Sequence, residues 1–131
     1  METLTAVRAI SALRVAWGTA LTFKTDALLR AMVRDADRTG PLSLFARTVG
    51  IRDLVFGLGA LLAALDAQRR SEIDRWLWLW LASDLADVFA GAAAARNVGR
   101  SGSIAAAAAP LPFVAAGLWS LRRLAKSPIP V

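Results

Sequence analysis

The chain has 131 residues, 56% of them hydrophobic, and a formal net charge of +6. This apolar fraction exceeds the roughly 45–50% of an ordinary soluble domain, and the mean hydropathy is +0.49. The sequence contains no cysteine and no histidine. Disulfides, thiol nucleophiles and thiolate metal sites are therefore excluded, and metal hydrolysis and Ser-His catalysis are disfavoured. We expect no metal and no cofactor, and any acid or base must be a carboxylate.

Charge-poor segments alternate along the chain with short clusters of Arg and Asp, which is typical of a protein that crosses a membrane several times. The basic residues sit at the ends of the apolar segments, where anionic lipid headgroups would meet them, and not on one face that could bind nucleic acid. The sequence therefore predicts an all-α, four-transmembrane-helix bundle in a single domain. We expect a multi-pass protein of the bacterial inner membrane, since the preference for Arg over Lys suits a GC-rich genome.

The predicted spans are residues 4–23, 44–65, 76–95 and 104–121. Arg14 divides the first apolar segment, which argues against a cleaved signal peptide, so we interpret this span as retained. Residues 24–40 place apolar side chains at helical spacing and basic side chains on the other face. Such an amphipathic segment suits the headgroup layer, and a cytosolic connecting helix is an equal alternative. Basic residues divide evenly between the two sides, so the positive-inside rule predicts no orientation.

Local signals predict where the helices begin and end. Thr39-Gly40-Pro41 predicts a break and then the start of the second span, because proline is tolerated in a first helical turn. Ser71-x-x-Asp74 before an apolar run predicts a capping box at the start of the third span. Residues 96–103 are typical of a polar turn and lack the spacing and the lysine of a phosphate-binding loop. Pro110-Leu111-Pro112 predicts a kink in the fourth span.

Five ionisable residues fall near the middle of their predicted spans, namely Arg14, Arg52, Asp53, Asp84 and Asp87. Two central aspartates cost the third span roughly 5 to 7 kcal/mol on the insertion scale, so they need partners of opposite charge on neighbouring helices. The sequence does not specify which arginine pairs with which aspartate. Ion pairs that only hold the bundle together are one interpretation, and a functional site is the other.

The charged residues of the first three spans share a helix face with small residues. Small residues mark the places where membrane helices approach closely, so these stripes should face one another and not lipid. The stripes are Ser11, Arg14, Gly18 and Thr22 in the first span, Asp53, Gly57, Ala60 and Ala64 in the second, and Trp80, Asp84, Asp87 and Gly91 in the third. We therefore predict an inward-facing polar cluster.

This cluster carries one more carboxylate than it has arginine side chains. Asp84 and Asp87 are three residues apart on a helix and resist double ionisation, so we predict that they share one proton. The candidate acid–base residues are Asp84, Asp87 and Asp53, and the candidate substrate-binding residues are Arg14, Arg52 and Trp80. In these roles an arginine would anchor or polarise the substrate, and an aspartate would move the proton.

Three functions fit this pattern. The first is binding of a small hydrophobic or lipid-like molecule, or acid–base chemistry on it of the isomerisation or cyclisation type. The second is proton-coupled transport of a small molecule by a dimer. The third is a non-catalytic subunit of a membrane complex. The expected partners are the lipid bilayer and a small hydrophobic ligand, and a homodimer stays open.

The second span opens with Gly50-Ile51-Arg52-Asp53-Leu54-Val55-Phe56-Gly57, and Trp17-Gly18 follows an arginine in the first. This pattern resembles small bacterial four-span families of unknown function, similar in style to DoxX-like proteins. The resemblance covers most of the chain in layout, with Gly-x-Arg-Asp as its specific part. It implies four helices and a membrane location, and no catalytic residues. Small multidrug transporters also have four short spans, but they carry an acidic residue in the first helix, where this chain has Arg14.

Overall fold

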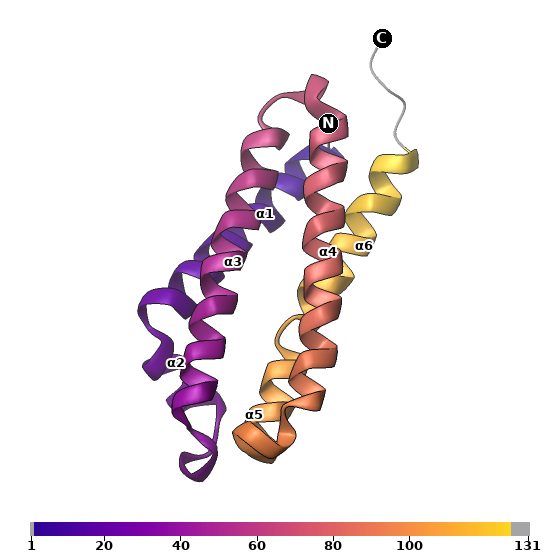
Figure 1. Ribbon diagram of the computed structural model, residues 1–131. Helices are drawn as coiled ribbons and strands as arrows, with labels where there is room; N and C mark the ends of the chain where they lie inside the picture. The colour runs from indigo at the N-terminus through magenta and orange to yellow at the C-terminus, as the bar shows by residue number, and fades with distance from the viewer. Residues whose placement is uncertain (1, 127–131) are drawn as a thin grey trace.

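The computed structural model describes residues 2–126, and Figure 1 shows the arrangement of its helices. The described residues are helical apart from short connections and contain no strand, which confirms the predicted all-α class. The α-helices are α1 (Glu2–Phe23), α2 (Thr25–Met32), α3 (Gly40–Ala64), α4 (Arg70–Ala93), α5 (Ala95–Ala108) and α6 (Leu111–Lys126). Two 3-10 helices, η1 (Asp35–Asp37) and η2 (Ala67–Arg69), lie in the connections.

The long helices run alternately in opposite directions (Figure 1). Helices α1 and α3 form one closely packed pair, and α4 packs against α5 and α6. The connection from α3 to α4 and the end of α6 lie at one end of the molecule. Helix α2, η1 and the connection from α4 to α5 lie at the other end. The short α2 therefore covers only the lower part of the α1–α3 pair.

Glycines allow the helix backbones to approach closely. A Cβ atom added at Gly18 of α1 would lie 2.5 Å from the amide nitrogen of Leu54 and 2.7 Å from the carbonyl oxygen of Gly50. A Cβ atom added at Gly91 of α4 would lie 2.6 Å from the amide nitrogen of Ala107 in α5. Small residues at such contacts are the usual means by which helices pack when little hydrophobic force drives them together.

Two clusters of buried apolar side chains form the core, and a further group of buried side chains is polar or charged. Arg14, Asp53, Asp84 and Asp87 are buried, as are nearly all members of the three predicted stripes, with Thr22 half-buried. The inward orientation of these stripes is thereby confirmed. Large apolar side chains are exposed on every long helix, and they include Leu13, Phe23, Leu44, Ile51, Val55, Leu62, Trp78, Leu85, Phe89, Ile104 and Leu111.

The start of α3 is as predicted, and the start of α4 is not. Thr39 caps α3 by accepting a hydrogen bond from the amide of Leu42 at 3.4 Å. The predicted capping box at Ser71 is wrong, because α4 begins one residue earlier, at Arg70, without a side-chain cap. The turn before it is capped by Asp66, which accepts from the amide of Gln68 at 2.9 Å, and η2 leads directly into α4.

The polar turn predicted at residues 96–103 is confirmed only in part, because these residues belong to α5 but the helix is kinked at Gly99. Only Gly99 leaves helical geometry, with a φ of +73° that a glycine adopts without strain. The Asp37 carboxylate covers this bend and accepts hydrogen bonds from the Ser101 amide at 3.0 Å and the Ser101 hydroxyl at 2.5 Å. These hydrogen bonds hold the pKa of Asp37 below its ordinary value and tie η1 to α5.

The fourth predicted span is broken near its middle. Helix α5 ends at Ala108 and α6 begins at Leu111, so the kink predicted from Pro110 is confirmed. Taken together as Ala95–Lys126, this is the one helical stretch in residues 2–126 that is long and apolar enough to cross a membrane by length and composition. In α1, α3 and α4 the charged residues near mid-helix lower the hydropathy.

We expect the Gly18→Ala variant to lose about 1–3 kcal/mol of stability, because its new Cβ meets α3 backbone atoms that cannot move without separating the helices. Gly40→Ala is the matched control, since a Cβ at Gly40 meets nothing within 4 Å. Unfolding by denaturing detergent, followed by far-UV circular dichroism, measures both. Equal unfolding midpoints for the two variants would show that the close α1–α3 contact is wrong.

Candidate functional site

The five charged residues predicted at mid-span converge in the structure. Arg14 comes from α1, Arg52 and Asp53 from α3, and Asp84 and Asp87 from α4. We call these five residues the charged cluster. Each arginine binds one aspartate of α4 through both of its terminal nitrogens, and Asp53 lies between the two pairs. The pairing that the sequence left open is therefore Arg14 with Asp84 and Arg52 with Asp87.

Arg14 is the fully enclosed arginine of the charged cluster. Its Nη1 donates to Asp84 Oδ2 at 2.6 Å, and its Nη2 donates to Asp84 Oδ1 at 2.5 Å and to Asp53 Oδ1 at 2.7 Å. The guanidinium carbon lies 4.5 Å from the ring centroid of Trp80 and 4.9 Å from that of Phe113. Two-point ion pairing and contact with two aromatic rings are the interactions that stabilise a buried guanidinium best.

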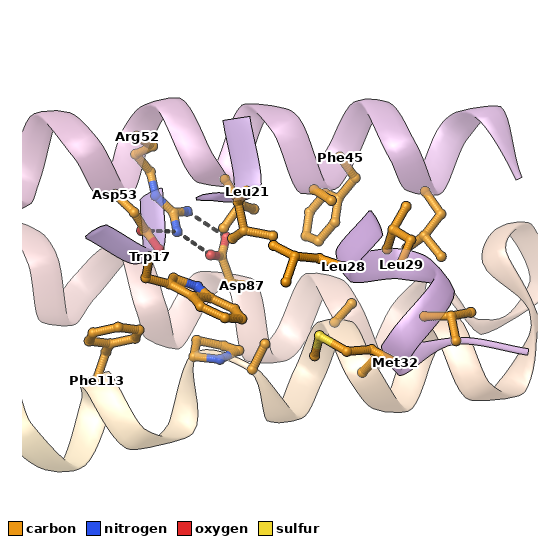
Figure 2. A pocket seen from close by; sticks show the side chains of 18 residues that line it. Trp17, Leu21, Leu28, Leu29, Met32, Phe45, Arg52, Asp53, Asp87 and Phe113 are labelled. Carbon is orange, nitrogen blue, oxygen red and sulfur yellow. Dashed lines mark hydrogen bonds and ion pairs between the residues drawn. The ribbon is translucent and has the colours of Figure 1, made fainter. Parts of the chain in front are cut away.

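Arg52 holds the second pair and is less enclosed, with 24% of its side chain exposed. Its Nη1 donates to Asp87 Oδ1 at 2.6 Å, and its Nη2 donates to Asp87 Oδ2 and, at 3.2 Å, to Asp53 Oδ1. Figure 2 shows these interactions as dashed lines. Asp53 Oδ1 therefore accepts from both arginines and couples the two ion pairs.

One carboxylate oxygen of the charged cluster is not bound by an arginine. Both oxygens of Asp84 and both oxygens of Asp87 accept from guanidinium groups, as does Asp53 Oδ1. Asp53 Oδ2 accepts no hydrogen bond from the described residues, and 4% of the side chain is exposed. Asp53 is therefore the aspartate of the cluster with an oxygen that no guanidinium group engages.

Among the described residues, no hydrogen bond joins the carboxylates of Asp84 and Asp87, which are predicted to share a proton. Each accepts hydrogen bonds from a different arginine, and Arg52 Nη2 also lies 3.8 Å from Asp84 Oδ1. The sequence spacing places the two side chains on one helix face, but it does not reveal that a guanidinium group would engage each of them separately. A shared proton between Asp84 and Asp87 therefore stays a prediction.

A cavity of about 60 Å³ adjoins one side of the charged cluster. Figure 2 shows Arg52, Asp53 and Asp87 at one end and the side chains of α2 at the other. Apart from those three residues, its walls are apolar and come from α1, α2, α3, α5 and α6 together with Val33, Ala109 and Pro110. The aromatic lining residues are Trp17, Phe45 and Phe113. Small-molecule sites are usually apolar with a few converging polar groups and measure roughly 300–1,000 Å³, so this cavity has the chemical character of such a site but is small.

The end of the cavity that lies farthest from the charged cluster is close to the protein surface. Met32 of α2 lines it and is 46% exposed, whereas the other lining side chains are buried or half-buried. Ala105 and Ala109 also line the cavity, next to the break between α5 and α6. Met32 therefore marks a place where the cavity wall meets the protein surface.

Three predicted site residues line the cavity and three do not. Arg52, Asp53 and Asp87 form its charged end. Arg14, Asp84 and Trp80 lie behind them, and Trp80 packs against Arg14 and Phe113 in place of the expected pocket wall. The sequence did not predict that Trp17, Phe113 and the side chains of α2 line the cavity. The one signal for Trp17 was its position next to Gly18.

No protein family, curated protein or solved structure matches the chain. The resemblance to DoxX-like proteins therefore stays a prediction. Function is inferred below from the geometry of the residues alone.

We expect Arg14→Met to lose about 3–5 kcal/mol of stability, because it leaves Asp84 buried without its partner. Adding Asp84→Asn restores the original charge balance of the cluster, so the double variant should recover at least about 1 kcal/mol of that loss. Detergent-induced unfolding of the wild type, both single variants and the double variant measures the coupling. Additive losses would contradict the pairing of Arg14 with Asp84.

Proposed function

We propose that this protein is a membrane protein of four spans that binds a small lipophilic molecule in the cavity beside the charged cluster. The spans are α1, α3, α4 and the α5–α6 pair. The observation that carries the proposal is an apolar cavity that ends on Arg52, Asp53 and Asp87. The membrane location is supported by the distribution of exposed charge and ligand binding is supported by the cavity, so the two parts of the proposal are independent.

The distribution of exposed charge supports the membrane location. Charged side chains are buried within residues 9–23, 48–65 and 76–95, except that 24% of the Arg52 side chain is exposed. From Arg75 to its end at Ala93, α4 rises about 27 Å. The hydrocarbon core of a bilayer is about 30 Å thick. The molecule thus has an uncharged belt of the right height, with large apolar side chains pointing outward.

Helix α2 has the character of a helix at the membrane surface. Leu29 is buried on one face, and Asp26 and Arg30 are exposed on the other. It lies at the end of the uncharged belt, beside the mouth of the cavity. An amphipathic helix in the headgroup layer would place this mouth where lipophilic molecules concentrate. A ligand could enter from the bilayer without crossing water.

Binding is the first candidate, because the cavity is apolar and ends on three charged residues. Proton-coupled transport stays a prediction. Acid–base chemistry on the bound molecule is the second candidate, and the Asp53 Oδ2 that no arginine engages is the observation that favours it. A carboxylate oxygen within the wall of an apolar site is able to accept or donate a proton. Asp84 and Asp87 are less suited to that role, because arginines bind both oxygens of each. A homodimer or a role as a complex subunit stays a prediction.

The absence of cysteine from the sequence allows a direct test of the membrane location. Val55 lies in the uncharged belt and is 51% exposed, and Ala67 is exposed in the turn before α4. We expect Ala67→Cys to react with a water-soluble maleimide in membranes, after permeabilisation if needed, and Val55→Cys to stay unreactive until the protein is denatured. Equal labelling of both cysteines in the native state would contradict a membrane belt around α3.

Ligand binding is tested by filling the cavity. Native mass spectrometry of wild-type protein, extracted from its membrane in mild detergent, should show a small lipophilic molecule bound. Ala105→Leu should lose at least about 90% of this adduct, since Ala105 lines the cavity and the larger side chain occupies its volume. Ala108→Leu is the control, because Ala108 is exposed and does not line the cavity. The same adduct on all three proteins would place the ligand elsewhere.

A further inference from the structure

We propose that the ligand of the cavity carries a protonated amine on an apolar chain, and that Asp53 Oδ2 accepts a hydrogen bond from this ammonium group. The inference rests on the proposed function, because it assigns the chemistry of the molecule that occupies the same cavity. It is argued from the charge balance of the cluster, from the one free carboxylate oxygen and from the walls of the cavity.

The charge balance favours a cationic group. The charged cluster contains two guanidinium groups and three carboxylates, which leaves one negative charge unmatched. Every other charged side chain among residues 3–126 is at least partly exposed, so none of them is buried beside the cluster. A ligand with a carboxylate or phosphate would add to the excess negative charge in a low-dielectric site. A ligand with a single positive charge would neutralise it.

The position of the free oxygen places this charge at the cavity. Asp53 is the member of the cluster that contacts both arginines through one oxygen, and it also lines the cavity. Its second oxygen accepts no hydrogen bond from the described residues, and 4% of the side chain is exposed. An ammonium N–H is the strongest hydrogen-bond donor that such a carboxylate oxygen could take from a ligand.

The walls beside Asp53 suit an ammonium group on an apolar chain. Trp17 and Phe113 lie near the charged end, and Phe45 lies farther along (Figure 2). Aromatic faces attract a cation that has left water. Beyond the rings, Leu28, Leu29 and Met32 of α2 offer an apolar path toward the surface. A single unbranched chain would follow this path while its ammonium group stays at Asp53.

Three probes with the same chain and different head groups test the inference: decylammonium, decanol and decanoate. Each is titrated by calorimetry into the protein in phosphatidylcholine nanodiscs, and empty nanodiscs of the same lipid supply the reference for partitioning. We expect decylammonium to bind the wild type at least about tenfold more tightly than decanoate, with decanol between them. Equal binding of the three probes, or tighter binding of decanoate, would overturn the inference.

Asp53→Asn is the decisive variant. It removes the unmatched charge while the Arg14–Asp84 and Arg52–Asp87 pairs remain, so the cluster becomes neutral and the helices keep their ion pairs. We expect decylammonium and decanoate to bind this variant with affinities within about threefold of each other. A preference for decylammonium that persists in Asp53→Asn would overturn the role of Asp53.

Two further comparisons are made. The first distinguishes failure of this inference from failure of the proposed function, and the second identifies the source of the amine. If the three probes bind equally to the wild type and none binds to Ala105→Leu, the cavity remains a ligand site and only the preference for an ammonium group is wrong. No binding of any probe above the empty-nanodisc reference would overturn the inference itself. Replacing part of the phosphatidylcholine with phosphatidylethanolamine should weaken decylammonium binding if the amine belongs to a lipid headgroup, and should leave it unchanged if the amine is free.

Discussion

Ion pairs of two guanidinium groups, one buried and one partly exposed, fix the arrangement of three helices, because they join arginines and aspartates of different helices at the same depth. Arg14 of α1 contacts Asp53 of α3 and Asp84 of α4, and Arg52 of α3 contacts Asp87 of α4. Such contacts form only where the backbones are close, which explains why Gly18 and Gly57 lie one turn from Arg14 and Asp53 along their helices. Sliding any one helix by a turn would leave a buried charge unpaired, which costs several kcal/mol.

The two ion pairs have different surroundings and suit different roles. Arg14 and Asp84 are enclosed by Trp80 and Phe113, so this pair holds the helices in register. Arg52 and Asp87 form part of the cavity wall, where a bound molecule would contact them. Asp53 joins the two environments, since one of its oxygens accepts from both arginines. A change of charge at the cavity therefore acts, through Asp53, on the Arg14–Asp84 pair that positions α1.

The sequence predicted the interior of this protein better than its connections. Helical spacing was enough to place the charges and small residues of three helices on facing stripes, because each stripe lies within a single helix. Residues 96–103 were predicted as a turn from their glycines and polar side chains, yet only Gly99 departs from the helix, since Asp37 reaches across from 64 residues away to hold Ser101. The same limit applies to the cavity. Its walls come from six helices, and no local pattern reveals that side chains of α2 and α5 would line the same cavity.

The span of sequence between the ion-pair partners bears on how the chain would assemble in a bilayer. Arg14 is separated from Asp53 by 39 residues and from Asp84 by 70. In the proposed topology, a ribosome would complete α1 long before either carboxylate exists, and an isolated arginine at mid-membrane depth is costly. Helix α1 would then wait at the translocation machinery, or at the membrane surface, until α3 and α4 emerge. The buried cluster would thus make insertion a concerted event in which the third span determines when the first becomes stable.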